Sequence, residues 1–141
     1  MNQIDTIALT QELISLDTVN PPGNEAGAAK IPGKLLAEHG FDISYHTYGP
    51  NRLHLVAEKG ISGKIAPLVL SGHLDTVPLG EKPWTTDPFA GTCREGKLYG
   101  RGASDMKSGV AAMTVAAIEA TQETSPEGGI RLIFSAGEER G

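Results

Sequence analysis

The 141-residue sequence is poor in cysteine and aromatic residues and has no excess of positive charge, and each shortage excludes a class of protein. Cys93 is the only cysteine, so an internal disulfide is excluded and a reducing compartment, the cytoplasm, is expected. Without a catalytic partner nearby in sequence, Cys93 is expected to be a small buried or partly buried thiol. The net charge of −5, with no basic run and no aromatic-plus-basic stripe, excludes nucleic acid as a partner.

Long hydrophobic runs are missing as well. The N-terminal segment through Asn20 has neither a basic start nor a long apolar stretch, so we expect no secretion signal, no membrane span and no membrane partner. What remains is ordinary for a globular chain, with 39% apolar and 21% charged residues. A chain of this length can bury roughly two-thirds of its unfolded surface, so one domain with a true core is expected.

Hydrophobic periodicity and turn residues predict helices that alternate with strands. Helices are predicted at 4–16, 24–40 and 106–122, strands at 41–48, 53–58, 67–70 and 130–135, and a hairpin around 94–97. The run 68–70 is wholly apolar and the run 130–134 is apolar except for Arg131, so we expect them to be neighbouring interior strands, covered on both faces. The alternation predicts an α/β fold in which a layered sheet has helices on both faces.

The apolar strand before Ser71 is followed by a histidine and an aspartate two positions apart. In extended backbone, His73 and Asp75 point to the same face. A metal-bound histidine needs an acceptor on its other ring nitrogen, and Asp75 is placed to supply it. The alternative is a surface histidine beside an aspartate. The position favours a site, because open α/β sheets bind ligands at the carboxyl ends of their strands.

A carboxylate lies between a glycine-rich loop and the predicted helix from Met106. Asp105 is a favoured residue type for an N-cap, which is the alternative interpretation. Residues 100–104 contain more glycine than capping needs, which indicates unusual backbone dihedrals beside a ligand. A metal-bridging carboxylate fits this position.

Two adjacent glutamates follow the apolar strand that ends at Ser135. Glu138 and Glu139 would repel one another, at little cost if both are solvated, which is the alternative. Beside the other two positions, they would serve as one metal ligand and one proton shuttle. The three signals together are more specific than any one alone.

Read in order, four motifs resemble the successive motifs of a known family: SGHLDTVP, WTTDPFAG, GKLYGRGASDMKSG and FSAGEERG. The family is the zinc-dependent amidohydrolases and peptidases that include acetylornithine deacetylase, succinyl-diaminopimelate desuccinylase, aminoacylase and carboxypeptidase G. The segment NPPGNE also resembles the family's opening segment, so the resemblance covers essentially all of the chain.

The resemblance implies a zinc-exopeptidase-like catalytic domain with two zinc ions, for which cobalt or manganese would substitute. It implies that His73 binds one zinc, Asp75 orients it, Asp105 bridges both ions, Glu138 is the general base and Glu139 binds the second zinc. The implied reaction is amide hydrolysis in N-acyl amino acids or small peptides. A dipeptidase or carboxypeptidase of the same family and a non-catalytic interaction module that retains the motifs are the alternatives.

Members of that family are longer than this chain. They carry a further acidic ligand, a histidine ligand near the C-terminus, and a lid domain through which they form homodimers. We therefore expect residues 1–141 to be a truncated N-terminal portion of the catalytic domain, without the lid and the C-terminal segment. The resemblance also predicts a cis peptide bond between Asp105 and Met106.

Overall fold

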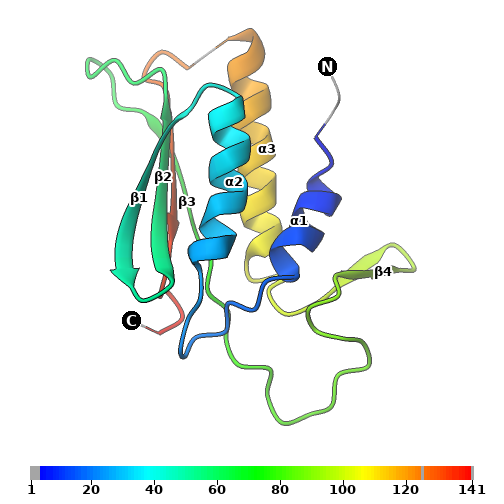
Figure 1. Ribbon diagram of the computed structural model, residues 1–141. Helices are drawn as coiled ribbons and strands as arrows, with labels where there is room; N and C mark the ends of the chain where they lie inside the picture. Colours follow the sequence, from blue (N-terminus) through cyan, green and yellow to red (C-terminus); the bar gives the residue numbers. More distant parts are fainter. Residues whose placement is uncertain (1–3, 125, 141) are drawn as a thin grey trace.

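The computed structural model describes residues 4–124 and 126–140 and contains each predicted helix and strand (Figure 1). The helices are α1 (Thr6–Ile14), α2 (Ala26–Glu38) and α3 (Lys107–Glu123). The strands are β1 (Asp42–Gly49), β2 (Arg52–Lys59), β3 (Leu68–His73), β4 (Thr92–Arg94), β5 (Lys97–Tyr99) and β6 (Ile130–Ser135). The predicted hairpin is the β4–β5 turn, whose central residues Glu95 and Gly96 have φ angles of 52° and 73°.

The start of α1 and the end of α2 have residues whose chemistry suits those positions. Asp5 caps α1, because its carboxylate accepts from the main-chain amides two and three residues further on. After α2, Gly40 takes a φ of 80° and Phe41 donates from its amide to the carbonyl of Leu36 at 3.1 Å. This left-handed glycine and six-to-one hydrogen bond form a Schellman motif, which turns the chain into β1.

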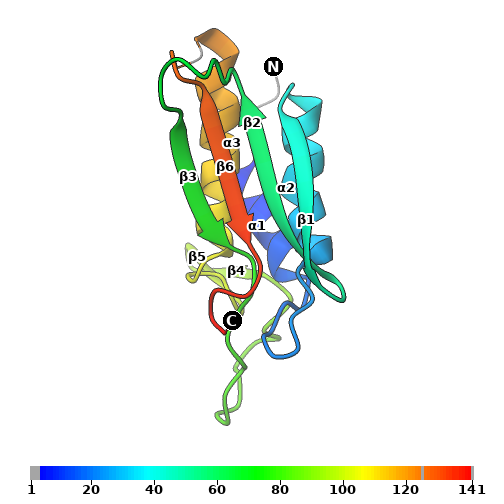
Figure 2. The ribbon, with the colours of Figure 1, turned by 90° about the vertical axis from the view of Figure 1, so that its left-hand side faces the viewer.

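The main sheet has four strands in the order β1-β2-β6-β3 (Figure 2). β3 and β6 are parallel neighbours, with Leu70 opposite Leu132, and the other pairings are antiparallel. β6 is an interior strand, as predicted. The prediction that β3 is interior is wrong, because no described strand pairs with its outer side, and Leu68 and Val69 are 54% and 46% exposed. An apolar run predicts burial but cannot tell an edge from the middle of a sheet.

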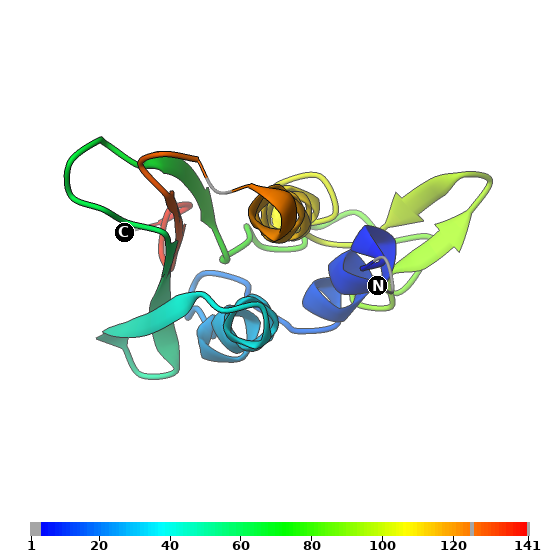
Figure 3. The same ribbon diagram turned by 90° about the horizontal axis from the view of Figure 1, so that it is seen from above.

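All three helices lie on one side of the sheet (Figure 3). α2 packs on β1 and β2, α3 packs on β3 and β6, and α1 packs against α3. β6 alternates accordingly: Ile130, Leu132 and Phe134 are buried under the helices, and the residues between them are half-buried. The α/β layered class is confirmed, but the described chain has helices on one face of the sheet, where the sequence predicted them on both.

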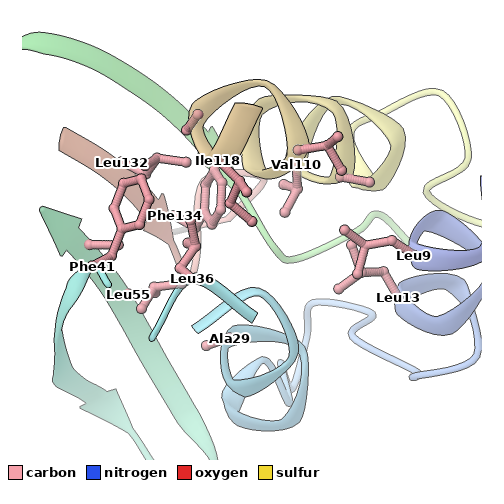
Figure 4. Close-up of a cluster of buried hydrophobic side chains, with 14 of the residues drawn as sticks. Leu9, Leu13, Ala29, Leu36, Phe41, Leu55, Val110, Ile118, Leu132 and Phe134 are labelled. Atoms are coloured by element: carbon pink, nitrogen blue, oxygen red, sulfur yellow. The ribbon is translucent and has the colours of Figure 1, made fainter. Parts of the chain in front are cut away.

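The hydrophobic core fills the space between this face and the helices (Figure 4). Fully buried members include Leu13, Leu36, Leu55, Val110, Ile118, Leu132 and Phe134. Burial of each such side chain stabilises the fold by about 1.5–3 kcal/mol before entropy is counted. This core holds β3, β6 and α3 in fixed positions. The polar residues singled out in the sequence lie at the end of β3, in the loops after β3 and β6, and just before α3.

Two smaller expectations concern the surface. Cys93 lies in β4 and is exposed, so the prediction of a buried or partly buried thiol is wrong. The two-stranded β4–β5 hairpin projects from the domain and offers little cover (Figure 1). Among residues 4–124 and 126–140, no helix is both long and apolar enough to cross a membrane.

Candidate metal centre

The parallel pairing of β3 and β6 brings two of the predicted segments together. His73, the last residue of β3, is opposite Ser135, the last residue of β6. Leu74 then donates from its amide to the Ser135 carbonyl at 2.9 Å. The loops that carry Asp75 and the two glutamates therefore start side by side at the carboxyl edge of the sheet, as the strand-end argument predicted.

His73 is 7% exposed and its ring orientation is fixed from one side. Its Nδ1 atom lies 3.0 Å from the main-chain oxygen of Asp75. Because a carbonyl oxygen only accepts, Nδ1 carries the proton and the lone pair of the neutral ring is on Nε2. Nε2 lies 3.0 Å from Asp105 Oδ1 and 3.8 Å from Glu138 Oε2. Acceptors facing one another in this way require a proton or a cation between them.

The electrostatics of the site favour positive charge. Burial by itself would lower the pKa of His73, but the Asp75 carbonyl and the nearby carboxylates outweigh it, so the pKa is raised. Burial, followed by the neighbouring charge of Asp105, raises the pKa of Glu139. A carboxylate crowded by other carboxylates is stabilised by a bound cation.

Asp105 faces the histidine and does not cap the helix. The peptide bond between Asp105 and Met106 is cis, as predicted. The N-cap of α3 is Met106, and no side chain caps it by a hydrogen bond. The alternative interpretation of Asp105 as an N-cap is therefore wrong, and its carboxylate is available to a ligand at the strand ends.

The predicted convergence of His73, Asp105 and Glu139 is confirmed. One ligand atom from each residue lies within 4.8 Å of the other two. A divalent transition metal binds nitrogen and oxygen ligands at about 2.0–2.2 Å, so two ligands of one ion lie up to about 4.4 Å apart. An imidazole and two carboxylates at this spacing fit a divalent cation after small side-chain movements. The individual roles assigned to these residues stay predictions.

Asp75 does more than the sequence predicted. Its carboxylate lies 3.4 Å from His73 Nδ1, but the closer hydrogen bond is the one that Nδ1 donates to the main-chain oxygen of Asp75 at 3.0 Å. The carboxylate itself is fully buried and accepts from the amides of Glu138 and Glu139, both at 3.0 Å. Asp75 therefore fixes the loop that presents the two glutamates.

Two buried polar residues near the site were not singled out in the sequence. The Nδ2 atom of Asn20 donates to Asp75 Oδ2 at 2.9 Å. Lys107 is 1% exposed and its Nζ atom donates to the Leu16 carbonyl at 2.7 Å. Burial, opposed by Asp17, lowers the pKa of Lys107 to about 8. Both residues lie in motifs that carry the family resemblance. The local pattern did not predict their burial, because Asn20 before two prolines and a glycine indicates only a turn, and a lysine at a helix start is normally solvated.

An α/β domain with an imidazole and carboxylates gathered at its strand ends has the architecture of a metal-binding domain. The family model described as Peptidase family M20/M25/M40 matches residues 69–141, which is just over half of the chain. The chain belongs to this family, as the motifs predicted, and the family's metallopeptidases use divalent metal ions.

Relatives agree over nearly the whole chain. It is 41% identical over 140 residues to succinyl-diaminopimelate desuccinylase 2 of Ruegeria sp. (strain TM1040), covering 98% of this chain and 34% of that protein. The crystal structure of human carnosine dipeptidase 1 matches with a TM-score of 0.78 and 27% identity, over 95% of this chain and 32% of that one.

A third match, the M20 family metallo-carboxypeptidase Sso-CP2 from Sulfolobus solfataricus, has a TM-score of 0.81 and 20% identity, over 96% of this chain and 31% of that one. At that identity, the match shows the fold alone. The chain thus spans about a third of the length of these relatives.

Proposed function

We propose that this chain carries the metal-binding part of a hydrolase that cleaves the amide bond of N-acyl amino acids or small peptides. The observation that carries the proposal is the convergence of His73, Asp105 and Glu139 from three separate segments to within 4.8 Å. Zinc is the proposed metal, with two ions in the complete site, because a mixed imidazole and carboxylate set suits zinc and the resemblance assigns two ions.

In this proposal each residue has a defined task. His73 binds one ion through Nε2, since Nδ1 is held by the Asp75 carbonyl at 3.0 Å. Asp105 would be the bridging ligand, and its side chain is 75% exposed, so the carboxylate is accessible to a bound ion. Glu139 is the ligand of the second ion. The bound metal would lower the pKa of a water molecule and polarise the substrate carbonyl.

Glu138 is the proposed general base. Its side chain is 59% exposed and its Oε2 atom lies 3.8 Å from His73 Nε2, so the carboxylate borders the cluster and remains open to substrate. Its backbone is fixed by the hydrogen bond from its amide to Asp75 Oδ1 at 3.0 Å. The carboxylate would take a proton from water and deliver it to the departing amine, the usual double task of such a group.

An N-succinyl amino acid is the first substrate to test. The relative that is 41% identical is a succinyl-diaminopimelate desuccinylase, and the chain matches it over 98% of its own length. A dipeptide is the second candidate, because human carnosine dipeptidase 1 shares 27% identity at a TM-score of 0.78.

The chain's place in a larger protein is also proposed. Coverage of 34% of the desuccinylase supports residues 1–141 as the N-terminal portion of a catalytic domain. The lid domain and the remaining metal ligands would belong to other parts of that larger protein. The lid domain would then mediate formation of a homodimer. A reducing compartment, the cytoplasm, is proposed because the single thiol of Cys93 is exposed and has no intrachain disulfide partner.

Zinc titration by calorimetry tests the metal site directly. The 141-residue chain is expected to bind zinc, and His73→Ala is expected to weaken binding by at least about tenfold, because a ligand is removed. His46→Ala, on the exposed part of β1, is the matched control and should leave binding unchanged. Hydrolysis of an N-succinyl amino acid and of a dipeptide is then assayed with zinc present. No zinc binding at micromolar concentration would support the non-catalytic alternative.

A further inference from the structure

Residues 16–20, which we call the bracing segment, connect the end of α1 to the loop before α2 and lie against the loops of the metal centre. At one end, the Leu16 carbonyl accepts from Lys107 Nζ at 2.7 Å, at the start of α3. In the middle, the Thr18 carbonyl accepts from the Thr76 amide at 3.0 Å. The Thr18 hydroxyl also donates to the Leu74 carbonyl at 2.7 Å. The bracing segment is therefore bonded to two of the three site segments before its last residue is considered.

Asn20, the last residue of the bracing segment, reaches the third segment. It is 3% exposed, and its main-chain amide donates to the Thr76 carbonyl at 2.8 Å. Its side-chain nitrogen donates both to Asp75 Oδ2 at 2.9 Å and to the Arg140 carbonyl at 2.6 Å. The two N–H groups of the Asn20 side chain therefore join the loop after β3 to the loop after β6.

The Asp75 carboxylate continues this network to the glutamates. Oδ1 accepts from the Glu138 amide, and Oδ2 accepts from the Glu139 amide as well as from Asn20. Asp75 is fully buried, so its charge depends on the protein groups that surround it, among them these hydrogen-bond donors. Removal of the Asn20 amide would deprive the carboxylate and the Arg140 carbonyl of a donor at the same time. The loop from 138 to 140 would then be held at fewer points.

We propose that Asn20 is a positioning residue of the metal centre. It holds the Asp75 carboxylate and the 138–140 loop in the arrangement that presents Glu138 and Glu139 to His73. Its effect on metal binding rests on the proposed function, whereas its effect on the loop can be measured without metal. Removal of a group that orients metal ligands through hydrogen bonds typically lowers metal affinity by about 10–100-fold.

The test compares Asn20→Ala with Thr121→Ala in the 141-residue chain. Thr121 is a matched control, because its buried hydroxyl also makes hydrogen bonds but lies near the far end of α3. Hydrogen exchange is followed by NMR in the metal-free protein for the amides of Glu138 and Glu139, with Phe134 in β6 as internal reference. Zinc affinity is then measured by calorimetry on the same samples.

In Asn20→Ala, exchange at the two glutamate amides is expected to accelerate by at least about tenfold relative to Phe134, as the loss of a buried hydrogen bond implies. Zinc affinity is expected to fall by about 10–100-fold, and Thr121→Ala should change neither quantity. An unchanged exchange ratio, or a zinc affinity equal to that of the parent chain, would overturn the proposal.

Two other outcomes are also decisive. If the parent chain binds no zinc, the proposed function fails and the role of Asn20 is decided by the exchange ratio alone. If Asn20→Ala does not fold, Asn20→Ser is measured in its place, since its shorter hydroxyl keeps polarity but cannot reach both acceptors. Acceleration at Glu138 and Glu139 in this variant supports the proposal, and its absence contradicts it.

Discussion

A buried ion pair joins two parts of this chain that are distant in sequence. Glu25, at the start of α2, is fully buried, and its carboxylate pairs with Arg52 of β2. The two hydrogen bonds of this pair are 2.8 and 2.9 Å long, and the guanidinium lies 4.8 Å from the centre of the Tyr48 ring. A bidentate pair of this kind fixes both the distance and the orientation of two elements.

We predict that Arg52→Met lowers the free energy of unfolding by about 3–5 kcal/mol, because it leaves the Glu25 carboxylate buried without a counter-charge. The double variant Glu25→Met/Arg52→Met should lose less, since both charges are then removed. Urea denaturation of the two variants and the parent chain gives the comparison. A double variant less stable than Arg52→Met would show that the pair itself, and not the unpaired charge, dominates.

At the scale of elements, two glycines with positive φ lie at the boundaries of a helix and a strand. The loss of stability on replacing each one depends on the atoms that surround it. Gly40, after α2, has a φ of 80°, and a β-carbon there would lie 3.8 Å from the flexible end of Lys59. Gly129, before β6, has a φ of 79°, and a β-carbon there would lie 2.5 Å from the backbone of Gly60. An alanine at position 40 would have a strained backbone but room for its β-carbon. An alanine at position 129 would have a strained backbone and a β-carbon that clashes with neighbouring backbone atoms.

Gly40→Ala is accordingly expected to lower the free energy of unfolding by about 1–2 kcal/mol, the cost of left-handed backbone for an ordinary residue. Gly129→Ala should cost clearly more, because backbone atoms must also move. Thermal and urea unfolding of the two variants test this order. Equal losses would mean that the contact between Gly129 and Gly60 relaxes freely.

At the scale of the whole molecule, the sheet has an exposed apolar edge. Leu68 and Val69 of β3 are exposed, as is Ile65 just before the strand, at 50%. Proteins usually protect such an edge with charge or proline, because its unpaired amides and carbonyls bind other strands. β1, at the other edge of the sheet, is more polar along its length.

The isolated 141-residue chain is therefore expected to self-associate through β3 as its concentration rises. Val69→Lys should shift this association to higher concentration, because a charge on the edge must be desolvated for a second strand to pair. Thr47→Lys, which adds the same charge to exposed β1, is the control and should have less effect. Sedimentation velocity over a range of concentrations measures the difference, and equal effects of the two lysines would argue against β3 as the contact.

Much of the fold and the candidate site could be predicted from local patterns. The period of apolar residues is a property of the chain itself, so α3 and β6 were predicted to within a few residues. His73, Asp105 and Glu139 could be singled out because each is near the end of a predicted element, where side chains are free to bind ligands. Because the carboxyl ends of parallel strands meet at the same edge of a sheet, His73 and Glu139 could be expected to lie close together.

Other features follow only from the tertiary structure, because they depend on which surfaces meet. The apolar run of β3 is compatible with an interior or an edge strand, and β3 is at the edge because, among the described strands, only β6 pairs with it. Asn20 and Asp75 are 55 positions apart, so no local pattern links them. The sequence by itself determined the elements and the donor atoms of the site. The tertiary structure decided which buried groups hold those donors in place, because the hydrogen bonds of residues 16–20 to the site loops join segments that are distant in sequence and exist only after the core has formed.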